Sequence, residues 1–389
     1  MANASASALI AALKQAGLLD APTEAAFRAI PRAAFLPNLP PEQVYKDEAV
    51  PVKVDEDGTV LSSSSQPSMM AIMLRQLDLQ RGQSILEIGT GTGYNAALMQ
   101  HIVGETGRVT SIEIDSTVAE GARANLQRVT MGAVLVVEGD GALGYVPRAN
   151  YDRIIATAGI WDVPNAWVRQ LRPKGRLVAP IWLDGTEVSA AFTLRSDGSL
   201  YSDDNRMCAF LRLRGQASGP EVVTRVGTSS LYLGASTLID SAAIHILLSD
   251  DAQDSYLGVT LDQSEYWHSF LPYLVLNIPQ DFMLIRYTVS KDAPAYGLTG
   301  SGFALMIPGS ICFLPLAGRG SARSYGGSDA TLALEDTLAN WERAGKPQQE
   351  RLRLSLVPKG KATAQLGKVY PRREHDMIAW MELEGGKHG

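Results

Sequence analysis

The sequence contains few of the residues on which several common kinds of site depend. Cysteine occurs only twice among 389 residues, at Cys208 and Cys312, and the two are far apart and in no metal-ligand spacing. We expect both to be buried and reduced, which fits a cytoplasmic location. The five histidines form no H-x-x-H or H-E-x-x-H pair. A metal site is therefore not expected.

Long apolar runs and an excess of positive charge are also missing. No apolar stretch approaches the ~18 residues that a membrane span needs, and the N-terminus lacks a basic segment followed by an apolar core. A net charge of −6 and a pI near 5.5 argue against non-specific binding to a nucleic acid backbone. Neither a membrane nor a nucleic acid is therefore expected as a partner. The composition is that of a globular protein, and the length predicts two or three domains.

What the sequence does contain is a glycine-rich turn between a predicted strand and a predicted helix. Residues 84–95 read SILEIGTGTGYN, with an apolar run first and glycine at positions 89, 91 and 93. A helical pattern follows over residues 96–103. Strand, glycine turn and helix in this order predict a nucleotide-like ligand at the carboxyl end of the strand. Glycine is suited to such a turn because it lets backbone N–H groups approach the ligand closely.

The acidic residue in this strand, Glu87, indicates the kind of ligand. Dinucleotide-binding turns have the spacing G-x-G-x-x-G, whereas the spacing here is G-x-G-x-G and Tyr94 follows. A carboxylate beside the turn would repel a diphosphate. It would suit a cationic ligand with an amino acid end, such as S-adenosylmethionine. A simple tight turn and a NAD-linked oxidoreductase are the alternatives.

Further predicted strands carry polar residues at their tips. Strands are expected at residues 108–113, 134–137, 151–157 and 176–181, with a turn at 171–175 and closing strands at 188–194 and 207–213. Glu113 is placed to accept hydrogen bonds from two ribose hydroxyls, with Asp115 as the competing candidate. Asp140, which precedes Gly141, is placed to accept from an exocyclic amine such as that of adenine.

The chain divides into three predicted parts. Residues 1–60 are expected to form a helical cap, residues 61–215 a Rossmann-like α/β domain with a mostly parallel sheet, and residues 216–389 an α+β domain. In the last part we expect a helix at 329–344 and strands at 352–356 and 375–383. Trp267 and His268 are expected to be packing groups. The apolar runs of this part fit either an intramolecular brace or a groove for a peptide substrate.

A run of serines lies upstream of the glycine turn. Residues 61–68 read LSSSSQPS, which cannot form the interior of a helix. Pro67 favours an extended Gln66 and begins a helix that runs to residue 77. A serine run in isolation is most simply a flexible linker. This run, however, is one helix away from the glycine turn, which places it beside the ligand crevice.

Seven short segments between residues 20 and 195 together carry a family resemblance. They are AIPR at 29–32, SQP at 65–67, LEIGTGTGY at 86–94, IE at 112–113, GDG at 139–141, YD at 151–152 and LRPKGRL at 171–177. This stretch resembles the protein-L-isoaspartate O-methyltransferases, which are class I methyltransferases that use S-adenosylmethionine. The glycine motif alone indicates only a methyltransferase, and the upstream Ser-Gln-Pro narrows the resemblance to this family.

The resemblance implies methyl transfer to an Asp or isoaspartate carboxylate of a peptide or protein. It implies that Ser65 is the catalytic residue and orients that carboxylate. A carboxylate is ionised at neutral pH, so the reaction needs no general base, in agreement with the absence of a catalytic His or Cys arrangement. The residues expected to hold the cofactor are Ser64, Gln66, Glu87, Gly89, Thr90, Gly91, Gly93, Tyr94, Glu113, Asp140 and Gly141.

Two features depart from the family pattern. Four serines precede Gln66 where the family usually has Thr-Ile-Ser, and ordinary repair enzymes of the family lack the C-terminal domain. Extended members resemble the methyltransferases of ribosomally made peptides, in which a methylated Asp can cyclise to an aspartimide. The alternatives are an isoaspartate repair enzyme with an accessory domain, a small-molecule O-methyltransferase and a non-catalytic binding module. The sequence does not specify an oligomeric state.

Overall fold

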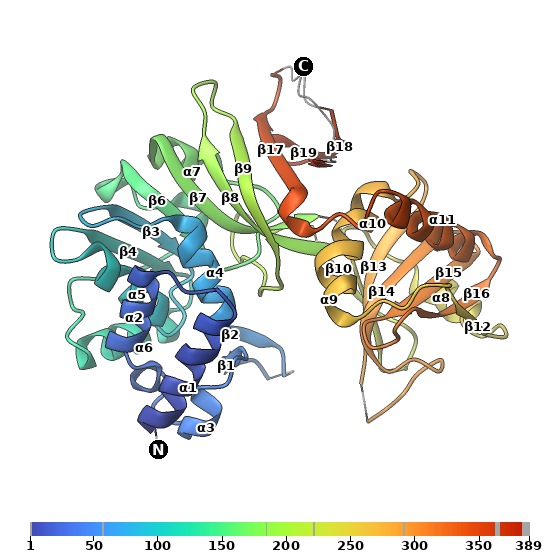
Figure 1. The fold of residues 1–389 in the computed structure, drawn as a ribbon, viewed down its shortest axis with the longest axis horizontal. Coiled ribbons are helices and arrows are strands. Elements are labelled where there is room, and N and C mark those ends of the chain that lie inside the picture. Colours follow the sequence, from blue (N-terminus) through green and yellow to red (C-terminus); the bar gives the residue numbers. More distant parts are fainter. Residues whose placement is uncertain are drawn as a thin grey trace.

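The computed structural model of the chain describes residues 2–56, 58–183, 185–220, 222–290, 292–361 and 366–382. Its strands form two large sheets and a two-stranded hairpin. The sheets stand in two lobes, and the red C-terminal strands lie with the first, mostly blue to green lobe (Figure 1). No helix among these residues is long and apolar enough to cross a membrane.

The first sheet contains ten strands in the order β18-β19-β17-β9-β8-β7-β6-β3-β4-β5. Its parallel strands are β3 (Ser84–Ile88), β4 (Arg108–Glu113), β5 (Leu135–Glu138), β6 (Tyr151–Ala156) and β7 (Leu171–Leu183). The helices around them are α4 (Pro67–Leu77), α5 (Tyr94–Val103), α6 (Ser116–Arg128), α7 (Asn165–Gln170), and the short η2 (Gly141–Leu143) and η3 (Val146–Arg148). The predicted α/β class is confirmed. Because β4 and β6 flank β3 on opposite sides, the carboxyl end of β3 is a topological switch point.

The antiparallel half of this sheet begins with β8 (Thr186–Leu194) and β9 (Leu200–Met207). The prediction of a closing strand at 207–213 is wrong, because the observed strand, β9, ends at Met207. Two of its buried residues, Ser202 and Asn205, are polar, so the segment has no apolar pattern. Their hydrogen bonds go to a distant part of the chain, with the Asn205 side chain donating to Leu352 O over 2.7 Å.

One predicted turn is part of a strand. Residues 171–175 belong to β7, and the register with β6 shifts between Tyr151 and Arg153. Lys174 has a φ of 62° there. The Pro-Lys-Gly sequence therefore makes a bulge in the strand where the sequence predicts a turn before it.

The N-terminal segment packs against α5. Its elements are α1 (Ala2–Gln15), α2 (Ala21–Ala29), η1 (Arg32–Phe35), α3 (Pro41–Val44) and the hairpin β1 (Val50–Val54) and β2 (Val60–Ser64). Asp20 caps α2 by accepting from the Thr23 N–H over 2.9 Å. Phe27 and Phe35 contact the ring of Tyr94 at the start of α5. The hairpin spans the predicted boundary at residue 60, so it links the cap to the serine run.

The second sheet is antiparallel, in the order β10-β11-β13-β14-β15-β16-β12. Its strands are β10 (Val222–Arg225), β11 (Leu231–Ala235), β12 (Gln253–Tyr256), β13 (Met283–Val289), β14 (Gly300–Ile307), β15 (Ser310–Pro315) and β16 (Ser321–Gly326). The helices of this region are α8 (Ser241–Leu247), α9 (Gln263–Glu265), the π-helical turn η4 (Tyr266–Phe270), α10 (Leu271–Asn277), α11 (Asp329–Arg343) and η5 (Gln349–Arg351).

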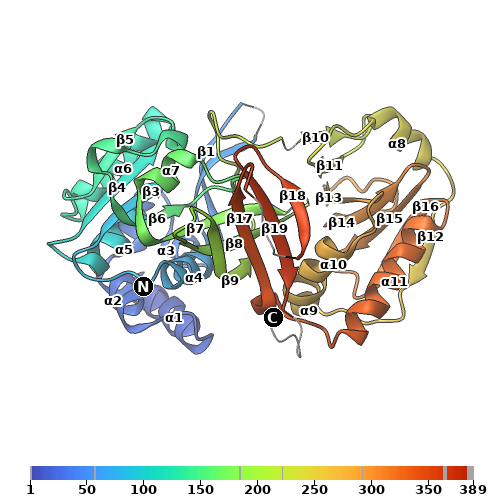
Figure 2. The ribbon, with the colours of Figure 1, turned by 90° about the horizontal axis from the view of Figure 1, so that it is seen from above.

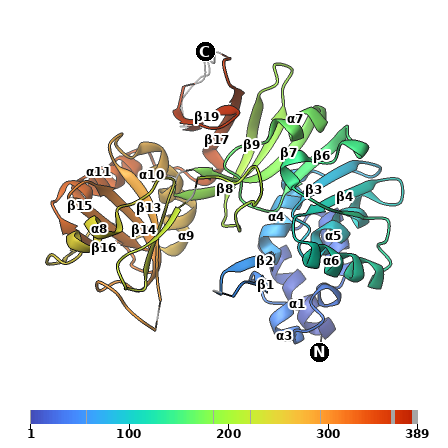
Figure 3. The ribbon, with the colours of Figure 1, turned by 180° about the vertical axis from the view of Figure 1, so that it is seen from behind.

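The C-terminal strands return to the first sheet. These are β17 (Leu352–Pro358), β18 (Lys368–Pro371) and β19 (His375–Met381), and β17 pairs with β9. Figures 2 and 3 show them between the two lobes, beside β8 and β9. Residue 383 of the predicted final strand lies outside the described residues. The predicted part 216–389 is thus divided between two sheets.

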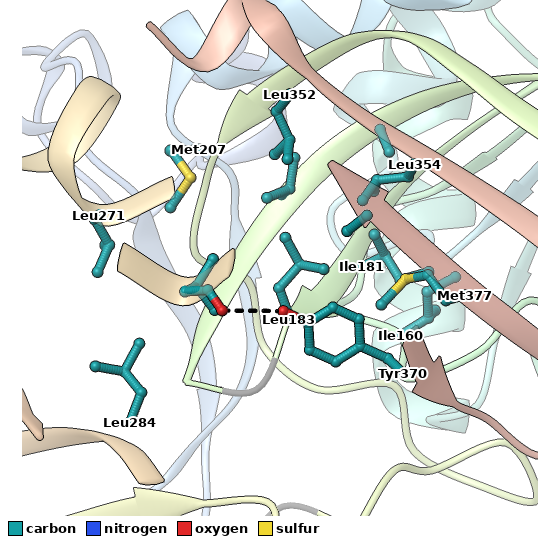
Figure 4. Close-up of a cluster of buried hydrophobic side chains, with 14 of the residues drawn as sticks. Ile160, Ile181, Leu183, Met207, Leu271, Leu284, Leu352, Leu354, Tyr370 and Met377 are labelled. Atoms are coloured by element: carbon teal, nitrogen blue, oxygen red, sulfur yellow. Dashed lines mark hydrogen bonds between the residues drawn. The ribbon is translucent and has the colours of Figure 1, made fainter. Parts of the chain in front are cut away.

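One apolar core joins the two lobes. Figure 4 shows side chains from both sheets in this cluster: Leu183 and Leu352 belong to the first sheet and Leu284 to the second. Tyr370 on β18 also donates its hydroxyl to Val275 O on α10 over 3.1 Å. The second lobe is therefore packed against the first and is not attached by a linker alone.

Candidate active site

A cavity of about 1090 Å³ lies at the carboxyl ends of β3 and β4. Its lining includes the glycine turn, the serine run, the end of β9 and residues from the second lobe. Most of the predicted site residues meet there: Ser64, Ser65, Gln66, Gly89, Thr90, Gly91, Tyr94, Glu113 and Gly141. Glu87, Gly93 and Asp140 are not part of the lining.

The glycine turn is held in a conformation that favours glycine. Gly89, Gly91 and Gly93 have φ angles of 95°, 53° and 84°. A Cβ at Gly89 would lie 2.7 Å from Thr157 Oγ1, and one at Gly91 would lie 3.4 Å from Ser63 O. The turn is therefore confined between the end of β6 and the serine run.

Glu87 lies beneath the turn. It is fully buried and accepts hydrogen bonds from Asn95 Nδ2 over 2.8 Å and from Ser111 Oγ over 2.5 Å. Burial raises the pKa of Glu87 to about 7, and the two hydrogen bonds oppose that change. Its carboxylate joins β3 to β4 and to α5. The expected direct contact with the ligand is not part of this arrangement, whereas Asn95, which Glu87 holds, does line the cavity.

Glu113 is the carboxylate that faces the cavity from the second strand. It is only 6% exposed, and it accepts from the Gly91 N–H over 3.0 Å and from the Asp115 N–H over 3.2 Å. Asp115 has other partners, since it caps α6 through the Val118 N–H and pairs with Lys53 over 2.7 Å. The hydrogen bonds from Lys53 lower the pKa of Asp115. The geometry therefore favours Glu113 over Asp115 for the ribose.

Asp140 is covered by the segment that follows β9, residues 208–218, which we call the strap. Its carboxylate accepts from the Ala142 N–H over 2.9 Å and from the strap's Gln216 N–H over 2.8 Å. Gly141, the next residue, does reach the cavity, and a Cβ there would lie 2.4 Å from Ile88 Cγ2. Asp140 therefore holds the strap against the start of η2, beside Gly141 of the cavity lining.

The serine run is fixed by Arg32. This arginine is 1% exposed, and it donates to Ser65 O over 3.0 Å and to Val44 O over 3.0 Å. The Ser65 side chain is half-buried, lines the cavity and makes no hydrogen bond to any residue in the described part of the chain. Gln66 is exposed and donates to Asp47 over 3.1 Å. The run thus brings Ser65 to the cavity on a backbone that Arg32 holds in place.

Sequence reasoning missed several cavity residues. Arg32, which lies behind the serine run and is not part of the lining, ends the Ala-Ile-Pro-Arg segment noted in the sequence, but its role depends on a fold that places residue 32 beside residue 65. No motif in the sequence indicates that the cavity is also lined by the end of β9, the strap, Trp267 and His268. Trp267 and His268 do pack, as expected, with the Trp267 ring 6.2 Å from that of Phe303, but they also line the cavity. No group of three or more metal-ligating side chains occurs within the described residues.

Comparison with known proteins identifies the family. The family model "Protein-L-isoaspartate(D-aspartate) O-methyltransferase (PCMT)" matches residues 4–218, which is more than half of the 389 residues. The chain belongs to this family. Members of the family are S-adenosylmethionine-dependent methyltransferases. The predicted family and cofactor are therefore confirmed.

Individual relatives agree with this assignment over the first lobe. "Protein-L-isoaspartate O-methyltransferase" of Thermotoga maritima is 40% identical over 183 residues, 47% of this chain and 57% of that protein. "Protein-L-isoaspartate O-methyltransferase 2" of Archaeoglobus fulgidus is 37% identical over 193 residues, 49% of this chain and 84% of that protein. The match thus spans little more than half of the Thermotoga relative.

One solved structure resembles nearly the whole chain. It is named "Protein-L-isoaspartate O-methyltransferase" and aligns with a TM-score of 0.54 and 25% identity, covering 97% of this chain and 100% of that one. Similarity therefore extends into the second lobe. An additional C-terminal region does not by itself set this chain apart from proteins of that name.

The cavity residues fit S-adenosylmethionine. The turn glycines adopt φ angles that favour glycine, and a Cβ at Gly89 would lie 2.7 Å from Thr157 Oγ1. Glu113 presents a carboxylate, 6% exposed, to the cavity, and the guanidinium of Arg214, which also lines the cavity, lies 4.0 Å from that carboxylate. These features suit a ligand with a ribose and a positive sulfonium.

Proposed function

We propose that the protein is a carboxyl O-methyltransferase that esterifies an Asp or isoaspartate carboxylate of a peptide or protein. One observation carries the proposal: the serine run and the glycine turn lie side by side in one cavity, whose lining includes Ser65. An acceptor carboxylate held by this hydroxyl would lie beside the methionine portion of the cofactor.

The reaction requires little of the protein beyond positioning the acceptor carboxylate and the methyl donor. When bound, S-adenosylmethionine supplies an activated methyl group, and the acceptor oxygen bonds to that carbon while the carbon–sulfur bond breaks and its electron pair stays on sulfur. Ser65 donates to the acceptor carboxylate and leaves one oxygen free to react. Arg32 keeps the Ser65 backbone in place. Orientation of this kind can lower a barrier by ~7–11 kcal/mol in favourable cases.

For the substrate, we propose a dedicated peptide, such as a ribosomal precursor whose methylated Asp later cyclises to an aspartimide. The second lobe supports this, because Trp267 and His268 line the same cavity as Ser65. The second candidate is isoaspartate repair, favoured by the whole-chain alignment with a structure of that name.

One assay separates these substrates. The enzyme is given S-adenosylmethionine with a labelled methyl group and three acceptors: an isoaspartyl peptide, the same peptide with Asp, and any short peptide encoded beside the gene. Label in the neighbouring peptide at Asp supports the dedicated substrate. Label in the isoaspartyl peptide alone would establish repair. Cofactor binding without label in any acceptor would contradict methyl transfer to peptides.

A further inference from the structure

One arm of the cavity extends away from the glycine turn towards the second lobe. Its lining side chains are Arg206 and Met207 at the end of β9, Trp267 and His268 on η4, and Gln349 on η5. Figures 1 and 3 show the β1–β2 hairpin on the side of the first lobe that faces α9, which leads into η4. The arm residues and Ser65 line one and the same cavity.

The π-helical turn aims two side chains into this arm and anchors the others. Tyr266 donates its hydroxyl to Leu314 O over 2.8 Å, and Ser269 accepts from Trp341 Nε1 over 3.0 Å. Tyr266, Ser269 and Phe270 are buried, whereas Trp267 and His268 are half-buried and reach the cavity. Such π turns are rare and often occur at functional sites. Trp267 is thus presented on a rigid support, which lowers the entropic cost of binding a ligand.

The polar groups of the arm already have partners, and its apolar surface comes from Trp267 and Met207. Arg206 pairs with Asp204 over 2.9 Å and also with Glu350. Gln349 accepts from the Met207 N–H over 2.7 Å. Burial lowers the pKa of His268, so its imidazole is neutral near pH 7. An acidic or basic side chain would meet no unpaired opposite charge among these residues, whereas an aromatic side chain would meet the indole of Trp267 and the thioether of Met207.

We propose that this arm binds an aromatic side chain of the peptide substrate, at a fixed distance along the peptide from the methylated residue. The proposal rests on the proposed function, since it assumes a peptide whose carboxylate reaches Ser65. Successive residues of an extended peptide are ~3.3 Å apart, so the neighbours of a residue at Ser65 must continue along the cavity. The arm would then select substrates by sequence, which a general repair enzyme does not require.

A positional scan of peptides tests this proposal. A Ser/Gly/Ala peptide with one central Asp or isoaspartate carries a single Phe, moved one position at a time, and kcat/KM is measured for each. We expect one position to raise kcat/KM by about tenfold over the peptide without Phe, as burial of one aromatic ring would. Trp267→Ala should remove that preference, so that the Phe-containing and Phe-free peptides have the same kcat/KM in this variant. Trp267→Phe should keep most of it.

Two controls make the result specific. Trp380→Ala removes an indole that is equally half-buried, stacks on Tyr201 and does not line the cavity, so it should keep the Phe preference. Calorimetric binding of S-adenosylhomocysteine should be the same in all variants, which shows that they are folded. A scan without any preferred position, or a preference that survives in Trp267→Ala, would overturn the proposal.

Direct binding keeps this inference separate from the proposed function. A fluorescent peptide with Asn in place of the acceptor cannot be methylated, yet its anisotropy reports binding. Tighter binding of the Phe form to the wild type than to Trp267→Ala supports the arm even where no peptide is methylated. Equal binding of both forms to both proteins refutes the arm, while methylation of a Phe-free peptide would leave the proposed function standing.

Discussion

Ser65 lines the cavity, and its backbone is fixed by the buried Arg32. We expect Ser65→Ala to lower kcat about 10- to 100-fold, the effect of losing one hydrogen bond to a charged group. The affinity for S-adenosylhomocysteine should change little, because the turn glycines and Glu113 are untouched. Ser65→Thr, which keeps the hydroxyl, should recover part of the activity. Loss of cofactor affinity alone would contradict the orienting role.

For Glu113 we expect a change in cofactor affinity in place of a change in kcat. Glu113→Gln should weaken cofactor binding about 10-fold or more, because a carboxylate accepts stronger hydrogen bonds from ribose hydroxyls than an amide does. Calorimetric titration with S-adenosylhomocysteine measures this. Glu138→Gln is a matched control, since Glu138 is the exposed register partner of Glu113 on β5. Unchanged affinity in Glu113→Gln would return the ribose role to Asp115.

Glu87 should make stability depend on pH. Its folded pKa of about 7 lies above the ordinary 4.5, so the folded state holds a proton that the unfolded state releases. The stabilisation that this bound proton gives the folded state is complete below pH 4.5 and is lost as the pH rises towards and through 7. A pKa shift of this size corresponds to roughly 3 kcal/mol in the free energy of unfolding. Glu87→Gln imitates the protonated form. Urea unfolding at pH 5.5 and pH 8 should show a smaller decrease in stability for the variant than for the wild type.

Glu87 also shows what sequence could and could not reveal about single residues. The glycine spacing and the strand tips predicted Glu113, because a residue at the end of a parallel strand must lie near the crevice. Glu87 lies inside the strand. The alternation of side chains between the two faces of a strand does not indicate which face lies towards the ligand. Its partners Ser111 and Asn95 come from two other elements, so its role beneath the turn required the fold.

At the scale of elements, the strap connects the segment between β18 and β19 with Asp140 beside the cavity. Arg373, which follows β18, donates to Gln216 O over 2.6 Å and to Ser218 O over 3.1 Å, and the Gln216 N–H meets Asp140. Arg373→Ala should therefore weaken S-adenosylhomocysteine binding about 3- to 10-fold, with kcat at saturating cofactor nearly unchanged. Lys359→Ala is the control, because it breaks an exposed ion pair with Asp376 on the neighbouring strands. Equal affinities in both variants would contradict the role of the strap.

Elements with a local signal were predictable, and those that depend on distant partners were not. The helix α11 has a helical period and a Gly-Pro-containing end, and the strand β17 alternates leucine with polar residues, so both were expected close to their observed positions. β9 was missed because its buried Ser202 and Asn205 hydrogen-bond to β17, about 150 residues later in the chain: the Leu354 N–H donates to Ser202 Oγ over 2.7 Å. Sequence periodicity cannot detect a strand whose buried face is polar.

At the scale of the whole molecule, the three C-terminal strands hold the lobes together. They complete the first sheet through β9, and Tyr370 and Lys368 both donate to Val275 O on α10 of the second lobe. Leu352, Leu354 and Leu356 are fully buried. Since one core spans both sheets, neither lobe can unfold without exposing apolar surface of the other.

The full chain should therefore unfold in a single calorimetric transition. A chain that ends at residue 348 lacks these strands, which uncovers β9 and the facing side of α10. We expect it to show two separate transitions, the first at a midpoint at least several degrees below that of the full chain, as loss of a few kcal/mol would produce. A chain that ends at residue 382 keeps all three strands and should behave as the full chain does. One transition with an unchanged midpoint after removal of residues 349–389 would contradict this expectation. It would mean that α10 and the strap join the lobes, and that the C-terminal strands add no stability at the edge of the first sheet.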